Sequence, residues 1–202
     1  MPRRYISADA QLFANGPLLD STMVSSSRIQ LPAGGLSALR LALAEVQPAS
    51  DSVATLRRIG FEMGERVHRE LAERIGDERE GALDEIPADE FWREVSGLFD
   101  ELGWGRLGFE ELHPGVASVT SGDWAEGEAE GLSTPGCHLT TGLLSDLLGR
   151  VAQADIAVLE VECRGRGDDR CLFLFGLPER LEDVFEEVRS GTAYGEALAS
   201  LG

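Results

Sequence analysis

Two of the three cysteines in this sequence lie eight positions apart, near either end of the segment VECRGRGDDRC, residues 161–171. Apolar runs flank the glycine and aspartate in its middle, a pattern typical of a β-hairpin. In a hairpin centred on Gly167, Cys163 and Cys171 lie directly opposite each other, with both side chains on one face of the sheet. Their sulfur atoms are then close enough to bind a single metal ion.

The third cysteine, Cys137, stands at the start of a helix predicted over residues 137–151. Free N–H groups and the positive end of the helix dipole favour a thiolate there. Three thiolates form a ligand set for a tetrahedral ion that prefers sulfur, and zinc is the ion expected. The alternative is that the three cysteines are simply core residues, since cysteine is among the most buried residue types.

A fourth ligand does not follow from the spacing alone. Glu160 lies three residues before Cys163, so in a regular strand the two side chains point to opposite faces. Glu160 joins the cysteines only if a β-bulge or another irregularity lies between them. His138 and Asp168 are the other candidates. The negative charge of the site is expected to be offset by three arginines of the same hairpin, Arg164, Arg166 and Arg170.

Apolar residues recur at helical spacing in five segments, which predicts helices over residues 32–46, 51–75, 87–102, 137–151 and 178–189. Gly60 and Gly64 lie one turn apart on the second helix and would allow another helix to approach closely. The apolar stripe of this helix is expected to be buried, and it comprises Val53, Leu56, Ile59, Met63, Val67, Leu71 and Ile75.

Strand patterns form two predicted hairpins, which comprise residues 106–112 with 116–121 and 155–164 with 170–176. Residues 123–136 are predicted to form a loop, which at that length is functional or mobile. We expect one α+β domain, with helices packed on a twisted antiparallel sheet. Residues 1–30 would form an N-terminal extension, and residues 177–202 a C-terminal helix and tail.

The charge of the chain excludes several classes of partner. With 36 acidic and 18 basic residues, its net charge of −18 repels nucleic-acid phosphates and anionic membranes. No run of about 18 apolar residues predicts a membrane span. Polar residues interrupt the first residues before the apolar region of a signal peptide can form, so we expect a cytoplasmic protein with reduced thiols.

At the cysteines the sequence resembles the V4R (vinyl-4-reductase) domain family. The family pattern is a cysteine that opens a helix, then Glu-x-x-Cys, a Gly-Asp turn and a Cys-x-Phe strand, which here are Cys137, Glu160 to Cys163, Gly167-Asp168 and Cys171 to Phe173. The family includes sensory domains of bacterial phenol- and toluene-responsive regulators and a relative associated with bacteriochlorophyll vinyl reduction. It is similar in fold to subunits of the TRAPP tethering complex.

The resemblance implies that three cysteines and one glutamate bind structural zinc, and it assigns these ligands to Cys137, Glu160, Cys163 and Cys171. It also implies a homodimer with a pocket for a small hydrophobic or aromatic ligand. Any of Trp92, Trp104 and Trp124 can line such a cavity, and the residues assigned to it are Trp104, Trp124 and Phe109. Because no segment resembles the ATPase or DNA-binding parts of the regulators, we expect signalling through an unknown partner protein.

Four protein ligands leave zinc no open position for substrate, so we expect a binding module rather than an enzyme. Two alternatives stay open. The family name suggests a carrier or accessory protein for vinyl reduction of tetrapyrroles, although the sequence has no nicotinamide or flavin motif. The likeness to TRAPP suggests a structural or interaction subunit that works through its surface.

Overall fold

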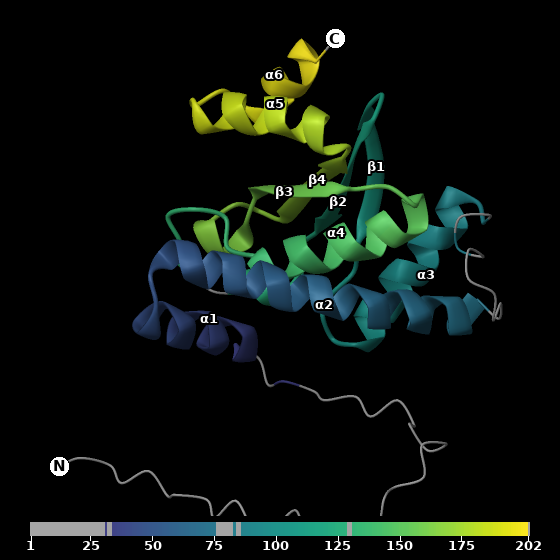
Figure 1. The fold of residues 1–202 in the computed structure, drawn as a ribbon, viewed down its shortest axis with the longest axis horizontal. Coiled ribbons are helices and arrows are strands. Elements are labelled where there is room, and N and C mark those ends of the chain that lie inside the picture. Colours follow the sequence, from purple (N-terminus) through teal and green to yellow (C-terminus); the bar gives the residue numbers. More distant parts are fainter. Residues whose placement is uncertain (1–30, 32–33, 76–82, 84–85, 129–130, 202) are drawn as a thin grey trace, which may run out of the picture.

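The computed structural model describes residues 31, 34–75, 83, 86–128 and 131–201, so the expected N-terminal extension, residues 1–30, lies outside the described residues. The described part contains six α-helices and four β-strands (Figure 1). The helices are α1 (Gly35–Val46), α2 (Ala49–Ile75), α3 (Ala88–Glu101), α4 (His138–Ala152), α5 (Pro178–Arg189) and α6 (Tyr194–Ser200). The strands are β1 (Gly108–His113), β2 (Val116–Ser121), β3 (Ala157–Glu162) and β4 (Cys171–Gly176).

The strands form one sheet in the order β1-β2-β4-β3, with every neighbouring pair antiparallel. The two predicted hairpins therefore join through β2 and β4. In Figure 1, α5 and α6 cover one face of the sheet, while α4 covers the other and is followed outward by α2 and α1. The expected α+β fold with an antiparallel sheet is confirmed.

Alternation along β4 divides its side chains between two hydrophobic cores. Phe173 and Phe175 face the core shared with α2, α3 and α4, whereas Leu172 and Leu174 face the core shared with α5 and α6. Cys171 follows the parity of Phe173 and therefore lies in the larger core, on the α4 side.

The packing of α2 against α4 uses glycines on both helices. A Cβ on Gly60 would overlap the backbone carbonyl of Leu139, and one on Gly142 would overlap that of Arg57. The close approach predicted at Gly60 is thus present. The predicted stripe is wrong at Ile59, which is 38% exposed. The buried face of α2 includes the two glycines, because contact between the backbones of α2 and α4 needs positions without side chains. This face comprises Ser52, Leu56, Gly60, Gly64, Val67 and Leu71.

Two segments differ from the expectation of irregular structure. The C-terminal tail contains α6, whose Ala197 and Leu198 pack with Leu181 and Val184 of α5. The loop predicted over residues 123–136 contains a 3₁₀ turn, Ala125–Glu128, and packs against the beginning of α4. None of the described helices combines the length and the apolar character that a membrane span requires.

Candidate metal centre and ligand pocket

Cys137, Glu160, Cys163 and Cys171 come together between α4 and the sheet. One ligand atom from each residue lies within 4.8 Å of those of the other three. The Sγ atoms of Cys137 and Cys171 are 3.8 Å apart. Two sulfurs bound to one tetrahedral zinc at about 2.3 Å would also lie about 3.8 Å apart. All three cysteines are free thiols and fully buried, and Glu160 is 5% exposed. These four side chains can hold one metal ion.

A β-bulge places Glu160 on the same face as the cysteines. Glu160 pairs with Phe173 of β4 and Glu162 with Leu172, so Val161 is the additional residue on β3. Val161 packs into the core beneath α5 and α6, and Glu162 accepts a hydrogen bond from the Tyr194 hydroxyl of α6. The consecutive residues Val161 and Glu162 thus both face α6, and the next residue, Cys163, faces α4 again. The irregularity required for Glu160 to join the cysteines is present.

The carboxylate of Glu160 has one oxygen with a partner and one without. Its Oε2 accepts the backbone N–H of Cys137 at 2.7 Å. Its Oε1 is buried and has no hydrogen-bond partner in the described part of the chain. A buried polar atom without a partner is unfavourable and calls for an explanation. A cation held by Oε1 and the three sulfurs supplies one, so the residues fit a metal ion.

The four acidic groups shift one another's protonation. Burial and the neighbouring Cys163 raise the pKa of Glu160 to about 9. Hydrogen bonds with Cys163 and Cys171, together with burial, raise the pKa of Cys137. The same sulfur contacts lower the pKa of Cys163, since one thiolate can accept hydrogen bonds from two thiols. All four groups cannot ionise together without a cation, whereas a bound divalent ion deprotonates its ligands.

The loop before α4 holds the beginning of this helix. The carboxylate of Glu126 accepts the backbone N–H groups of Leu139 at 2.9 Å and Thr140 at 2.8 Å. The Thr140 hydroxyl donates to the same carboxylate at 2.6 Å and accepts the indole N–H of Trp124 at 2.7 Å. Burial raises the pKa of Glu126. Glu126 therefore caps α4 immediately beside Cys137.

Gly127 lies directly against the thiol cluster. A Cβ at this position would lie 2.5 Å from Sγ of Cys171 and 3.8 Å from Sγ of Cys137. Sequence reasoning missed Gly127 and Glu126. Both lie about ten residues before Cys137, so spacing does not link them to it. The available signal was an acidic residue in a long loop that leads to a helix without a side-chain cap of its own.

The two other candidates for the fourth ligand lie outside the cluster. Asp168 accepts the backbone N–H of Cys163 at 2.7 Å through Oδ2, which orders the hairpin turn. His138 follows Cys137 at the first position of α4, where burial and the nearby Arg57 lower its pKa to about 4. Within the described residues, neither shares the ligand-atom group of the cysteines.

The side chains of the three hairpin arginines donate to acceptors other than the four candidate ligands. Arg166 pairs with Asp168 at 2.7 Å, and Arg170 pairs with Glu162 at 2.7 Å. Arg164 donates to the backbone carbonyl of Trp124 at 3.4 Å. Arg166 thus pairs with the carboxylate that accepts the backbone N–H of Cys163, and the backbone N–H of Arg164 donates to Cys171. These two arginines lie in the surroundings of the ligands, as the sequence suggested.

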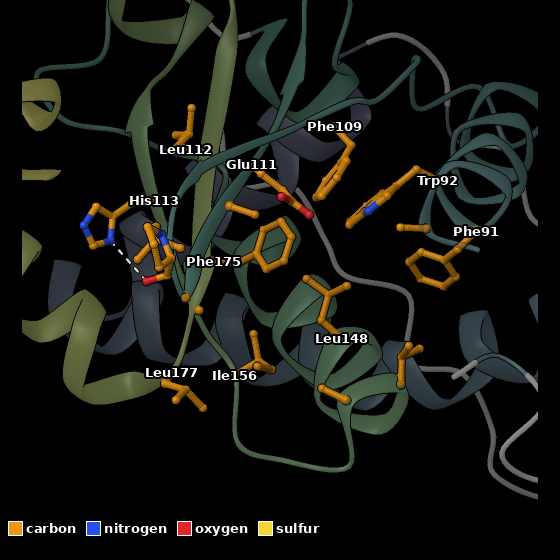
Figure 2. Close-up of a pocket in the computed structure, with 18 of the residues that line it drawn as sticks. Phe91, Trp92, Phe109, Glu111, Leu112, His113, Leu148, Ile156, Phe175 and Leu177 are labelled. Carbon is orange, nitrogen blue, oxygen red and sulfur yellow. Dashed lines mark hydrogen bonds between the residues drawn. The ribbon is translucent and has the colours of Figure 1, made fainter. Parts of the chain in front are cut away.

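An apolar pocket of about 810 Å³ lies at the other end of α4, between α3, α4 and the sheet (Figure 2). This volume is in the range of small-molecule sites, about 300–1,000 Å³. Four aromatic residues contribute to its wall, with Trp92 stacked on Phe109 at 4.9 Å and 12°, and Phe175 and Phe91 nearby. Aliphatic side chains of Leu148 and Ile156 extend the apolar surface.

The three residues assigned to a ligand pocket from the sequence occupy two places. Phe109 lines this pocket. Trp124 is fully buried near the thiol cluster, with its ring 5.7 Å from Trp104 and 5.3 Å from Phe99. Trp104 and Trp124 thus pack with each other in the core that contains the cysteines, and the tryptophan in the pocket wall is Trp92.

The family model described as the V4R domain matches residues 127–177, the segment that contains all four candidate ligands. This match confirms the resemblance to the V4R family. A search of curated proteins finds no match to the chain.

Three solved structures are similar to this one. The phenol-responsive sensory domain of the transcription activator PoxR with phenol has 21% identity and a TM-score of 0.62, over 80% of this chain and 82% of that one. A trafficking protein particle complex subunit 3 from Naegleria fowleri, covalently bound to palmitic acid, has 14% identity and a TM-score of 0.55, over 70% of this chain and 89% of that one. A vinyl-4-reductase family protein from Methanocaldococcus jannaschii has 20% identity and a TM-score of 0.48, over 75% of this chain and 83% of that one. The first two likenesses show a shared fold.

Proposed function

We propose that this protein is a sensory domain that binds a small hydrophobic ligand and is stabilised by a structural zinc ion. The observation that carries this proposal is the apolar pocket, whose walls are built partly from the elements that hold the thiol cluster. The V4R match and the fold shared with a phenol-responsive sensory domain support it.

Zinc is the proposed ion because three sulfurs and one carboxylate oxygen suit a borderline-soft ion in tetrahedral geometry. Calcium and magnesium prefer sites made of oxygen atoms. With all four positions filled by protein, the ion would join α4 to β3 and β4 and leave no position for a substrate. A structural role is therefore the one the ligand set favours.

We also propose a cytoplasmic homodimer that reports ligand binding to a partner protein. Three reduced thiols in one buried cluster suit a reducing compartment. An exposed apolar face of α1 is suited to contact with another chain, since Leu39 and Val46, two turns apart on one face, are 38% and 78% exposed.

The pocket proposal is tested with N-phenyl-1-naphthylamine, a neutral fluorescent probe, on purified protein whose zinc content is measured by elemental analysis. We expect one zinc per chain and saturable probe binding. Ala117→Phe places a ring in the pocket wall and should weaken binding at least about tenfold by occupying ligand volume. Ala199→Phe adds the same ring at an exposed position of α6 and should leave binding unchanged.

Equal probe binding by both variants would contradict the proposed pocket, and absence of zinc in protein purified without chelator would contradict the proposed ion. Mass spectrometry of ligands extracted from purified protein separates the alternatives. A porphyrin would favour a tetrapyrrole carrier, and absence of both extracted ligand and probe binding would favour a structural subunit.

A further inference from the structure

We propose that the ligand of the apolar pocket is an organic cation, in which an ammonium group is attached to an apolar body. This inference rests on the proposed ligand-binding function and names the chemical class of the ligand. It is carried by Glu111, a carboxylate located on the apolar face of β1.

The strand register places Glu111 on the pocket side of the sheet. Glu111 pairs with Ala117 of β2, which pairs with Phe175 of β4, so the three side chains form one row across the sheet. Phe109 lies two residues before Glu111 and shares its face. Leu112, on the opposite face, packs into the core with α5 and α6. The carboxylate therefore stands where the alternation of β1 calls for an apolar side chain.

Glu111 differs from the rest of the pocket wall in its charge. It is the one residue with a formal charge at neutral pH among the twenty described residues that line the pocket. Among the described residues, its carboxylate has no hydrogen-bond or ion-pair partner. It is exposed, so it stays hydrated at the pocket mouth when no ligand is bound. His113 lies on the same strand, and its Nδ1 contacts the carbonyl of Pro114 at 3.1 Å.

Aromatic rings line the same wall of the pocket as Glu111. Figure 2 shows the Glu111 side chain directed toward the rings of Phe109 and Phe175. The centroid of Trp92 lies 4.9 Å from that of Phe109 and 5.6 Å from that of Phe175. Ring faces attract cations, most strongly for tryptophan, and a carboxylate at the same place adds a charged acceptor.

The arrangement also selects against other head groups. A carboxylate on the ligand would meet Glu111 as a like charge, in a chain whose net charge is already −18. A neutral hydroxyl can donate to Glu111 but gains little from the ring faces. An ammonium group satisfies the carboxylate and the rings together, and its apolar body can extend toward Leu148 and Ile156. The predicted order of affinity is therefore cation, neutral molecule, anion.

Three probes with one apolar body test this order on the full chain in its zinc-loaded form: 4-phenylbutylammonium, 4-phenylbutanol and 4-phenylbutanoate. Their dissociation constants are measured by isothermal titration calorimetry at low ionic strength. We expect the ammonium to bind about tenfold more tightly than the alcohol, and the carboxylate to bind most weakly. The advantage of the ammonium should shrink as salt is added.

Three variants assign the effect to the pocket. Glu111→Gln keeps the shape of the side chain and removes its charge, so the ammonium should lose about tenfold in affinity while the alcohol is unchanged. Phe109→Leu removes a ring face and should weaken the ammonium more than the alcohol. Glu110→Gln alters the exposed neighbour on the other face of β1 and should change neither affinity.

The outcomes separate this inference from the function on which it rests. If the alcohol binds as tightly as the ammonium, or if Glu111→Gln leaves the ratio of their affinities unchanged, the cationic class is wrong while the pocket stands. If none of the three probes binds and N-phenyl-1-naphthylamine does not bind either, the proposed function fails, and this inference fails with it.

Discussion

The backbone N–H of Cys137 donates to Oε2 of Glu160 over 2.7 Å, which ties the first residue before α4 to the bulged strand β3. The other oxygen of this carboxylate, Oε1, remains without a hydrogen-bond partner among the described residues. One carboxylate therefore positions a backbone group with one oxygen and keeps the other buried without a partner. This division is what a carboxylate needs in order to serve as the fourth candidate ligand beside three cysteines.

Glu160→Gln is expected to weaken zinc binding about 100-fold, because it removes an anionic ligand and keeps an oxygen for the Cys137 N–H. By mass action, such a loss lowers the free energy of unfolding by about 2.7 kcal/mol when zinc is in excess. Competition with a chelator and chemical denaturation measure the two effects. Glu162→Gln is the control on the other side of the bulge and should leave zinc binding intact. Equal zinc affinity in the two variants would exclude Glu160 as a ligand.

Glu126 is expected to make stability depend on pH. Burial raises its pKa in the folded state above the ordinary value of 4.5, so the folded chain holds this proton longer than the unfolded chain does. The stabilising contribution is complete below pH 4.5 and is lost as pH rises through the raised pKa. The unfolding free energy of the wild type, measured relative to Glu126→Gln, should therefore fall as pH rises from about 5.

The matched control is Glu128→Gln, on an exposed glutamate of the same turn. Because its side chain is exposed, this variant should differ from the wild type in unfolding free energy by less than about 0.5 kcal/mol. A difference between wild type and Glu126→Gln that does not change with pH would show that Glu126 is ionised in both states.

Gly142→Ala should destabilise the fold by about 3 kcal/mol, because its Cβ would overlap the backbone carbonyl of Arg57 and force α2 away from α4. Gly195→Ala is the control, since a Cβ there meets nothing within 4 Å on α6. It should raise stability by about 0.5–1 kcal/mol through helix propensity. Denaturant melts measure both changes, and a Gly142→Ala variant as stable as the wild type would refute the close packing of the two helices.

Removal of zinc should weaken ligand binding, because two elements, α4 and β4, contribute to both sites. Cys137 precedes α4, which carries Leu148 of the pocket wall. Cys171 begins β4, which carries Phe175 of the same wall. We expect chelation to raise the dissociation constant of N-phenyl-1-naphthylamine at least about fivefold, and bound probe to strengthen zinc binding by the same factor. Circular dichroism checks that the chelated chain stays folded. An unchanged probe affinity in folded, zinc-free protein would show that the sites are independent.

Local patterns in the sequence predicted most of the fold. Hydrophobic periodicity located five helices and two hairpins. All of these except α1, in which no residue is buried, bury side chains on one face. Periodicity missed α6, whose seven residues contribute just the pair Ala197 and Leu198 to a core. It also predicted that Ile59 is buried, because periodicity detects large apolar side chains. The contact with α4 instead requires residues without a side chain, Gly60 and Gly64.

The candidate metal centre was predictable to the extent that hairpin geometry determines it. The placement of Cys163 near Cys171 follows from counting outward from Gly167, which also gives the observed pair of Glu162 with Leu172. The bulge at Val161 does not, because no local pattern of residues marks it, and its contacts on the α6 side lie about 30 residues away in sequence. The roles of Glu126 and Gly127 depend on the path of a long loop, and no local pattern describes such a path.

The thiol cluster and the apolar pocket occupy opposite ends of α4 and β4. The candidate metal ligands and the residues of the pocket wall are thus different positions on the same scaffold. Exchanges at Phe109, Leu148 or Phe175 can reshape the pocket while Cys137 and Cys171 keep their surroundings. Proteins with this arrangement can therefore change the shape of the pocket by substitution while the four candidate metal ligands stay the same.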